Sequence, residues 1–436
     1  MWSVQTIDFT SETKAKIMLP PNDEPSNCYF HRAKTTFLSL LCCAYIFIAG
    51  WLAFVSIGLF CRYLRLRFGV RVKPSSKRAI VITGATSGIG LGLAKRFYRK
   101  GFTVFAGYYD MQEPGYAELQ EIISDQDSIS KSNSAKLFLI HMDVRSEHSI
   151  DVAANEIDIL MRKFDCELHS VVCNAGLAND CSFEVNRLDN MLRLIQTNYI
   201  GTVMVAKRFT LPIIKSKGRI VIVSSLFHNQ ITPNASIYSS TKAAVKSLAD
   251  TLNEDLKRYG ASCRCVCPGV LMNKSNLIFS ASTCLKNCIA KLNDEERDLY
   301  KDSIAENIRA VDKQLKLRLN QLKEDPNQLP DTYITDLSDQ KTEFKFTRST
   351  INKDRIFDCI TGGNSGFMST VKTDIDEMGA LTAFDDAICL KDPPRRCYSG
   401  NKLYEYISGP VFGEYLPQIL VTAAYALTED RFRGKA

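Results

Sequence analysis

The sequence has no charged residue between Thr36 and Cys61, although charged residues make up 24% of the chain. An apolar run of this length exceeds the ~20 residues that a helix needs to cross a ~30 Å hydrocarbon core. The run is too long and starts too far from Met1 for a cleaved signal peptide, and the acidic residues before it exclude an amphipathic transit peptide. We therefore predict a transmembrane helix over 36–61, preceded by an N-terminal segment, 1–35.

The sequence also lacks the cysteine spacing of a disulfide-rich secreted protein, although it contains 15 cysteines. An odd number without framework spacing predicts reduced thiols. Cys263, Cys265 and Cys267 alternate with other residues, and neither a histidine nor a second cysteine pair stands at ligand spacing, so we expect a buried strand face rather than a metal site. Glycosylation sequons begin at Asn234 and Asn273, and the first lies four residues before Tyr238, a residue of interest below; sugars would be attached there in an oxidising lumen, so we favour a cytosolic face.

Basic residues are concentrated after the apolar run and account for much of the net charge of +7. Because more basic residues follow the run than precede it, the positive-inside rule places the C-terminal bulk in the cytosol. Anionic lipid headgroups explain a juxtamembrane cluster better than nucleic acid does, so we expect membrane lipid and no nucleic acid as a partner. Most of the cluster forms a linker, 62–77. Its members are Arg62, Arg65, Arg67, Arg71, Lys73, Lys77 and Arg78.

Short apolar runs alternate with helical stretches after the linker. This alternation predicts an α/β fold: a Rossmann-like, doubly wound parallel sheet that binds ligands at the carboxyl ends of its strands. We expect a single such domain over 78–325, behind the transmembrane helix. The expected strands lie in RAIVI and near Val104, Leu139, Val172, Val221 and Val266, and the expected helices include 150–164, 191–207 and 238–259.

Two polar stretches interrupt this alternation. Residues 123–135 are serine-rich and predict a flexible surface insertion, and residues 326–373 predict a second polar insertion. Residues 374–436 form the C-terminal part, for which a family resemblance described below implies a substrate lid and a membrane-associated tail. Within this tail, 416–427 is apolar but too short to span a bilayer, which suits an interfacial or core-packed helix.

Two motifs carry the chemistry. Tyr238 and Lys242 stand four residues apart, so one helical turn would place the phenol and the ammonium on one face, where the positive charge lowers the phenol pKa. The stretch from Thr83 to Gly90 has the spacing Gly-x-x-x-Gly-x-Gly, and such glycines let the backbone approach a pyrophosphate at a helix N-terminus. Each motif is weak alone, since an exposed helix pair without chemistry explains the first. Together they indicate nucleotide-dependent hydride transfer.

With these motifs the sequence resembles the short-chain dehydrogenase/reductase family over roughly 79–269. The markers TGATSGIG, MDV, CNAG, TNYIG, VSS, YSSTK and CPG occur in the order of that family. The resemblance implies a catalytic tetrad of Asn198, Ser225, Tyr238 and Lys242. Tyr238 would exchange a proton with the substrate oxygen that Ser225 binds, Lys242 would also hold the nicotinamide ribose, and Asn198 would anchor a water that relays protons.

The resemblance also implies NAD or NADP as cofactor. In the family, a basic residue near the position of Ser87 or of Tyr108 binds the 2′-phosphate of NADP, and neither of these residues is basic. Asp110 lies close to the position where an acidic residue binds the ribose hydroxyl of NAD. NAD is therefore favoured. Asp143 is expected at the adenine edge; a structural role is the alternative for both acids. Asn273 replaces the usual threonine of the nicotinamide site. The implied cofactor contacts are Thr83, Gly84, Ser87, Gly88, Ile89, Gly90, Asp110, Asp143, Asn174, Ala175, Gly176, Lys242, Pro268 and Gly269.

C-terminal stretches such as RRCYSGNKLYEYI resemble the retinol and hydroxysteroid dehydrogenase branch, which includes membrane-associated 3-hydroxybutyrate dehydrogenase. In this branch the helices after the sixth strand roof the substrate pocket. We therefore expect a membrane-anchored, homo-oligomeric oxidoreductase of the endoplasmic reticulum, facing the cytosol and acting on a hydrophobic alcohol such as a retinoid or steroid. The alternatives are a dehydrogenase of a small hydroxy acid and a non-catalytic nucleotide-binding sensor or scaffold.

Overall fold

The computed structural model describes residues 26–128, 135–178, 181–229, 233–269, 277–322 and 381–399. The expectations for residues 1–25, Asn273, the insertion 326–373 and the apolar stretch 416–427 lie outside these ranges. The chain divides into two compact units, Met1–Ile57 and Gly58–Ala436.

The described part of the first unit, residues 26–57, belongs to the long helix α1 (Ser26–Phe68). Within it, Thr36–Phe68 is long and apolar enough to cross a membrane, with a mean hydropathy of 2.3 and little burial. Large apolar side chains such as Tyr45 and Phe47 are exposed, as expected of a helix that faces lipid. The helix thus covers the predicted span and continues beyond it.

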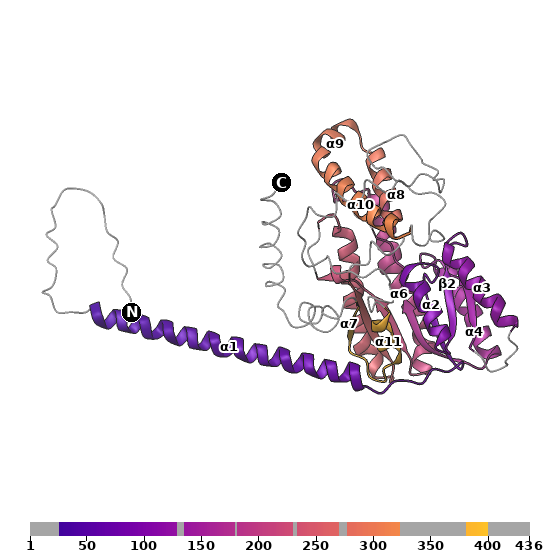
Figure 1. Cartoon of the computed structure of the whole chain (residues 1–436), viewed down its shortest axis with the longest axis horizontal. Helices are drawn as coiled ribbons and strands as arrows, with labels where there is room; N and C mark the ends of the chain where they lie inside the picture. The colour runs from indigo at the N-terminus through magenta and orange to yellow at the C-terminus, as the bar shows by residue number, and fades with distance from the viewer. Residues whose placement is uncertain are drawn as a thin grey trace, which may run out of the picture. The chain divides into compact units, whose positions relative to one another are not determined.

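The second unit is built on a sheet of seven strands in the order β3–β2–β1–β4–β5–β6–β7, and every described pairing is parallel (Figure 1). This confirms the predicted doubly wound fold. The strand order reverses between β1 and β4, which is where ligands bind in such sheets. The strands are β1 (Arg78–Ile82), β2 (Thr103–Tyr108), β3 (Leu137–His141), β4 (Glu167–Cys173), β5 (Arg219–Val223), β6 (Ser262–Pro268) and β7 (Arg396–Ser399).

Helices cover both faces of the sheet because strand side chains alternate between the two faces. Ala79 and Val81 of β1 belong to one buried core, and Ile80 and Ile82 belong to the other. The first core is shared with α4 (Glu147–Lys163), α6 (Gly201–Lys215) and α7 (Ser236–Lys257). The second core is shared with α2 (Gly88–Arg99), α3 (Pro114–Ser128) and α11 (Thr382–Cys389).

A smaller third core lies among α8 (Leu277–Ala290), α10 (Lys301–Leu322) and the residues Cys181 and Val185. The short helix α9 (Asp294–Leu299) lies between α8 and α10 in sequence. Asn293 and Glu296 form a capping box at its start, which satisfies backbone groups that the helix leaves unpaired. Figure 1 shows these three helices together in orange.

Two expectations need correction. Residues 123–128, predicted as part of a flexible insertion, are the last turn and a half of α3, because the apolar Ile122 and Ile123 pack on the sheet core and hold the helix there. Residues 382–399, predicted as part of a lid and tail, form α11 and β7 instead. Phe384 and Ile388 of α11 are fully buried against the sheet.

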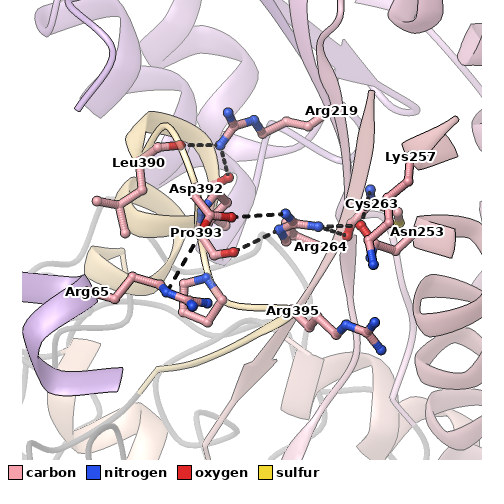
Figure 2. Close-up of polar contacts among 12 residues, drawn as sticks. Arg65, Arg219, Asn253, Lys257, Cys263, Arg264, Leu390, Asp392, Pro393 and Arg395 are labelled. Carbon is pink, nitrogen blue, oxygen red and sulfur yellow. Dashed lines mark hydrogen bonds and ion pairs between the residues drawn. The ribbon is translucent and has the colours of Figure 1, made fainter. Parts of the chain in front are cut away.

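Buried arginines hold the segment that leads from α11 to β7 (Figure 2). Arg219 of β5 donates to the carbonyl oxygen of Leu390 at 2.7 Å, and Arg264 of β6 donates to that of Pro393 at 3.1 Å. The carboxylate of Asp392 lies 4.0 Å from Arg264 and is largely exposed. These hydrogen bonds satisfy carbonyl groups that follow a helix end.

The predicted juxtamembrane linker is attached to the same segment. Arg71 forms an ion pair with the buried Asp386 at 2.6 Å, and the backbone N–H of Val72 donates to Cys389. Arg62 donates to the carbonyl oxygen of Arg396 at 2.9 Å. Part of the basic cluster therefore binds protein, because a buried carboxylate requires a partner. A lipid partner for the remaining members stays a prediction.

The alternating cysteines of β6 are buried, and all three contribute to the core shared with α4, α6 and α7. The predicted strand face is confirmed.

Candidate active site

The glycine turn between β1 and α2 is closely packed. Gly84 has a φ of +61°, which L-residues with side chains rarely adopt. A Cβ atom at Gly90 would lie 2.0 Å from the carbonyl oxygen of Gly84 and 2.6 Å from Nδ2 of Asn174. Only glycine fits Gly90 without displacing the turn.

Asn174, directly after β4, fixes this turn. Its Nδ2 donates to the carbonyl oxygens of Thr83 and Gly84, each at 3.0 Å. In return, Oγ1 of Thr83 accepts from the backbone N–H groups of Asn174 and Ala175, each at 3.0 Å. These bonds connect the carboxyl ends of β1 and β4, where the strand order reverses.

The turn leads into the N-terminus of α2, where the first backbone N–H groups lack acceptors within the helix. Ser87 precedes the helix but makes no capping hydrogen bond with its side chain, and the first turn has no acidic residue. Gly88, Ile89 and Gly90 form this first turn. The tight backbone and the positive end of the helix dipole suit the pyrophosphate of a dinucleotide.

Tyr238 and Lys242 lie on the first two turns of α7. The Nζ atom of Lys242 is 5.7 Å from the centre of the Tyr238 ring and donates to the carbonyl oxygen of Val223, at the end of β5, at 3.0 Å. Burial lowers the pKa of Lys242 from 10.5 to about 8. The structure thus places an ammonium group in the interior beside the phenol.

Asn198 approaches this pair from η1 (Gln196–Ile200), a single π-helical turn between α5 (Leu188–Ile195) and α6. Such turns occur often at functional sites. The Nδ2 atom of Asn198 donates to Oγ1 of Thr241 at 3.2 Å, and Thr241 in turn donates to the carbonyl oxygen of Tyr238 at 2.7 Å. Asn198 is therefore joined to the tyrosine turn through one threonine.

Asn198 also holds the segment after the CNAG motif. Its Oδ1 accepts from the backbone N–H of Leu177 at 2.8 Å, and its Nδ2 donates to the carbonyl oxygen of Leu177 at 2.9 Å. A Cβ atom at Gly176 would lie 3.3 Å from Oδ1 of Asn198 and 3.5 Å from Nζ of Lys242. Gly176, Asn198 and Lys242 therefore come together.

Ser225 follows β5 and caps η2 (Leu226–His228). Its Oγ accepts from the backbone N–H of Phe227 at 3.3 Å, which leaves the hydroxyl proton for a donor role. The Phe227 ring meets the Tyr238 ring edge-on, with the ring centres 5.9 Å apart. The carbonyl oxygen of Ser225 contacts Nδ1 of His228, whose pKa burial lowers to about 4.

In the outer part of the expected cofactor site, the two acidic residues are bonded to neighbouring groups of the chain. Asp110 is exposed, and its Oδ1 accepts from the backbone N–H of Gln112 at 2.9 Å. Asp143 accepts from both Nε and Nη2 of Arg145, at 2.9 Å each, which lowers the pKa of the carboxyl. Arg145 lies over the Tyr109 ring at 4.7 Å.

The remaining cofactor residues lie at strand ends. Pro268 is the last residue of β6 and pairs with Ser399 of β7, and Gly269 follows it. The next residues, 270–276, lie outside the described ranges.

Three residues that contact the expected site residues were not predicted from the sequence: Thr241, Phe227 and Arg145. Thr241 lies inside the YSSTK motif, so its spacing from Tyr238 could have indicated its role. No pattern indicated the ring contact of Phe227 or the pair between Arg145 and Asp143, since both depend on the path of loops after the strands.

Comparisons with known proteins agree with this geometry. The family model described as short chain dehydrogenase matches residues 78–277. Estradiol 17-beta-dehydrogenase 2 of Mus musculus is 31% identical over 233 residues, which are 53% of this chain and 56% of that protein. The mitochondrial D-beta-hydroxybutyrate dehydrogenase of Bos taurus is 29% identical over 226 residues, 51% of this chain and 61% of the relative.

Dehydrogenase/reductase SDR family member 7B of Xenopus tropicalis is 31% identical over 234 residues, 52% of this chain and 71% of that protein. The chain thus spans less than two thirds of the mouse and bovine relatives but more than two thirds of the frog relative. The matched residues include the glycine turn, Asn198, Ser225, Tyr238 and Lys242. The chain belongs to the short-chain dehydrogenase family.

Proposed function

We propose that the protein is a membrane-anchored oxidoreductase that transfers a hydride between a nicotinamide dinucleotide and a hydrophobic alcohol or carbonyl compound. The observation that carries this proposal is the buried Lys242, 5.7 Å from the ring centre of Tyr238 at the carboxyl end of the sheet. An exposed surface pair would not require an interior ammonium group, whose burial is unfavourable and marks functional sites. The bound dinucleotide would supply the hydride acceptor or donor.

Tyr238 acts as the general acid and base in this proposal. The cationic Lys242 favours the phenolate and so lowers the pKa of the phenol toward neutrality. The contact of Lys242 with Val223 fixes the amine at the end of β5. Tyr238 then takes the hydroxyl proton of an alcohol, or returns it to a carbonyl oxygen.

Ser225 and Asn198 support this proton transfer. The Ser225 hydroxyl donates to the reacting oxygen and stabilises the charge that develops on it. Asn198 orients the tyrosine turn through Thr241 and lies beside Lys242, where it would anchor the water that relays protons.

We propose NAD rather than NADP as the cofactor. Neither Ser87 nor Tyr108 offers a positive charge to a 2′-phosphate. Arg145 carries a positive charge near the expected adenine end of the site, but its Nε and Nη2 atoms both donate to the carboxylate of Asp143. An additional phosphate would have to compete with that carboxylate.

The substrate class follows from two independent considerations. An estradiol dehydrogenase is among the relatives, and α1 would hold the enzyme at a membrane, where hydrophobic alcohols such as steroids or retinoids partition. A small hydroxy acid is the second candidate, because D-beta-hydroxybutyrate dehydrogenases are relatives of similar identity. We further propose an endoplasmic reticulum location, a cytosolic catalytic unit and a homo-oligomer.

The test is a turnover assay of the detergent-solubilised full chain with panels of steroids, retinoids and hydroxy acids, each with NAD and with NADP. We expect cofactor reduction with a hydrophobic secondary or allylic alcohol and NAD. Tyr238→Phe, which lacks only the phenolic hydroxyl, should lose this activity while retaining cofactor binding. Binding of NAD without turnover of any panel member would favour the alternative of a nucleotide sensor or scaffold.

A further inference from the structure

His228 ends the short turn η2, which Ser225 caps at its start, and it contacts Ser225 twice. The backbone N–H of His228 donates to the carbonyl oxygen of Ser225 at 3.2 Å, and the Nδ1 atom of its ring contacts the same oxygen. The Oγ atom of Ser225 in turn accepts from the backbone N–H of Phe227 at 3.3 Å. Ser225 is therefore held both by its carbonyl oxygen and by its hydroxyl group.

The ring contact fixes the tautomer of His228. A carbonyl oxygen can only accept a hydrogen bond, so the Nδ1 atom must carry the hydrogen. Burial lowers the pKa of His228 to about 4, so the ring is neutral near pH 7 and its Nε2 atom carries no hydrogen. Nε2 is buried and has no hydrogen-bond partner within the described part of the chain. The hydrogen bond of the described ring is therefore the one from Nδ1 to Ser225.

The charged groups around the ring favour the same neutral state. Lys246 and Arg396 lower the pKa of His228, and Asp250 raises it by a smaller amount. The Asp250 carboxylate is itself paired with Lys246 at 3.3 Å and with Arg396 at 2.8 Å. Two cations and one carboxylate leave a positive charge beside the imidazole, which opposes its protonation.

The turn that His228 closes also contacts the tyrosine of the expected tetrad. The Phe227 ring meets the Tyr238 ring edge-on, with the ring centres 5.9 Å apart. Ser225, which is expected to bind the reacting oxygen, and Phe227, which packs on the phenol, thus belong to one turn with His228. A change in this turn would move the Ser225 hydroxyl relative to Tyr238.

We propose that His228 is a positioning residue that orients Ser225 through the hydrogen bond from its Nδ1 atom. Loss of this bond would release the carbonyl oxygen of Ser225 and let its hydroxyl leave the place from which it donates to the reacting oxygen. A displacement of ~1 Å is enough to slow a reaction substantially. The role in catalysis rests on the proposed function, but the hold of His228 on Ser225 is a property of the unliganded chain.

Two substitutions separate the two nitrogens of the ring. The amide nitrogen of an asparagine side chain can take the place of Nδ1 of a histidine, and that of a glutamine side chain the place of Nε2. His228→Asn should therefore keep the bond to Ser225, and His228→Gln should lose it. Glutamine is closer to histidine in size, so an effect of packing alone would harm His228→Asn more.

The first measurement is kcat per NAD-binding site of the solubilised full chain, with the best alcohol of the panel and with sites counted by fluorescence titration. We expect His228→Gln to lower kcat about tenfold at unchanged NAD affinity, and His228→Asn to retain most of it. A merely structural role would remove binding sites and leave turnover per site as it is. Equal activity of the two variants, or a lower kcat in His228→Asn than in His228→Gln, would overturn the proposal.

His169→Asn is the matched control. The Nε2 atom of His169 pairs with the carbonyl oxygen of Ile388 at 3.0 Å, and burial lowers the pKa of this ring to about 4 as well. His169 lies near the amino end of β4, away from the carboxyl ends of the strands where the site is expected. The variant should keep the kcat of the wild type per binding site. An equal loss in His169→Asn would assign the effect to any lost imidazole bond and refute a specific role of His228.

A second measurement tests the proposal without turnover. Hydrogen–deuterium exchange of the Phe227 amide, which donates to Oγ of Ser225, should be roughly fivefold faster in His228→Gln and unchanged in His228→Asn. Unchanged exchange in His228→Gln would contradict the hold on Ser225, whatever the kinetics. A wild type that turns over no alcohol but shows the expected exchange pattern would refute the proposed function and support the positioning of Ser225 by His228.

Discussion

The buried amine of Lys242 should make the stability of the protein depend on pH in a way that one substitution removes. Burial lowers the pKa of Lys242 from 10.5 to about 8, so the folded state binds fewer protons than the unfolded state between these pH values. Stability therefore rises with pH in this window. Below about pH 8 the charged amine is buried at full cost, and above about pH 10.5 it is neutral in both states.

The size of the effect follows from the same pKa values. A difference of about 2.5 pH units corresponds to about 3 kcal/mol at pH 7, at about 1.4 kcal/mol per unit. At pH 9.5 about 1.4 kcal/mol remains, because the folded amine is already neutral and the remaining cost is that of deprotonating a group of pKa 10.5 about one pH unit below its pKa. The wild type should therefore gain about 2 kcal/mol between pH 7 and pH 9.5 from this residue alone.

Lys242→Met keeps the length of the side chain but removes the charge. The variant also loses the hydrogen bond to the carbonyl oxygen of Val223, which changes the free energy of unfolding by the same amount at every pH. Only the change of that free energy with pH therefore reports the titration of the amine. Denaturant unfolding of the full chain in detergent would be compared between Tyr238→Phe and Tyr238→Phe/Lys242→Met, which excludes titration of the phenol. Parallel stability curves for the two proteins from pH 7 to pH 9.5 would refute the buried, pKa-lowered amine.

Three further predictions concern the cofactor turn, the buried ion pair and membrane topology. Gly90→Ala should abolish NAD binding in a fluorescence titration, because its Cβ would lie 2.0 Å from a backbone oxygen, whereas Gly92→Ala meets only the flexible Leu381 side chain at 3.2 Å and should bind normally. Asp386→Ala should lower the unfolding free energy by about 1–2 kcal/mol, because its partner Arg71 is 45% exposed and burial raises the pKa of the Asp386 carboxyl, and Asp392→Ala, whose carboxylate is largely exposed, by less than about 1 kcal/mol in the same denaturant titration. If the catalytic unit faces the cytosol, the Asn234 sequon carries no sugar, and glycosidase treatment of protein from cells should leave its electrophoretic mobility unchanged.

Much of the fold could be predicted because most strands and helices are recognisable from short stretches of sequence. The six strands from β1 to β6 are short apolar runs bounded by turns, and their alternation with helices allows few topologies. β7 was missed because it contains only four residues and begins with an arginine. Its place depends on tertiary contacts: Cys397 and Tyr398 are buried beside β6, and Arg264 and Arg219 hold the preceding segment.

Three of the four residues expected to form the tetrad lie where local sequence places them: Ser225 shortly after β5, and Tyr238 and Lys242 in the first two turns of α7. Asn198 lies in η1, in the middle of a continuous helical stretch. The sequence spacing of Tyr238 and Lys242 predicts their shared helix face, and the structure shows it. The burial of Lys242 was not predictable, since it depends on the packing of α7 against β5 and β6.

The most direct test of the central claim is to follow the hydride itself. The solubilised full chain would be incubated with NAD and an alcohol deuterated at the carbinol carbon, chosen from the panel, and the reduced cofactor analysed by mass spectrometry. The account predicts one deuterium in the reduced cofactor with the wild type and none above background with Tyr238→Phe. Absence of deuterium with the wild type for every alcohol, despite measurable NAD binding, would contradict it.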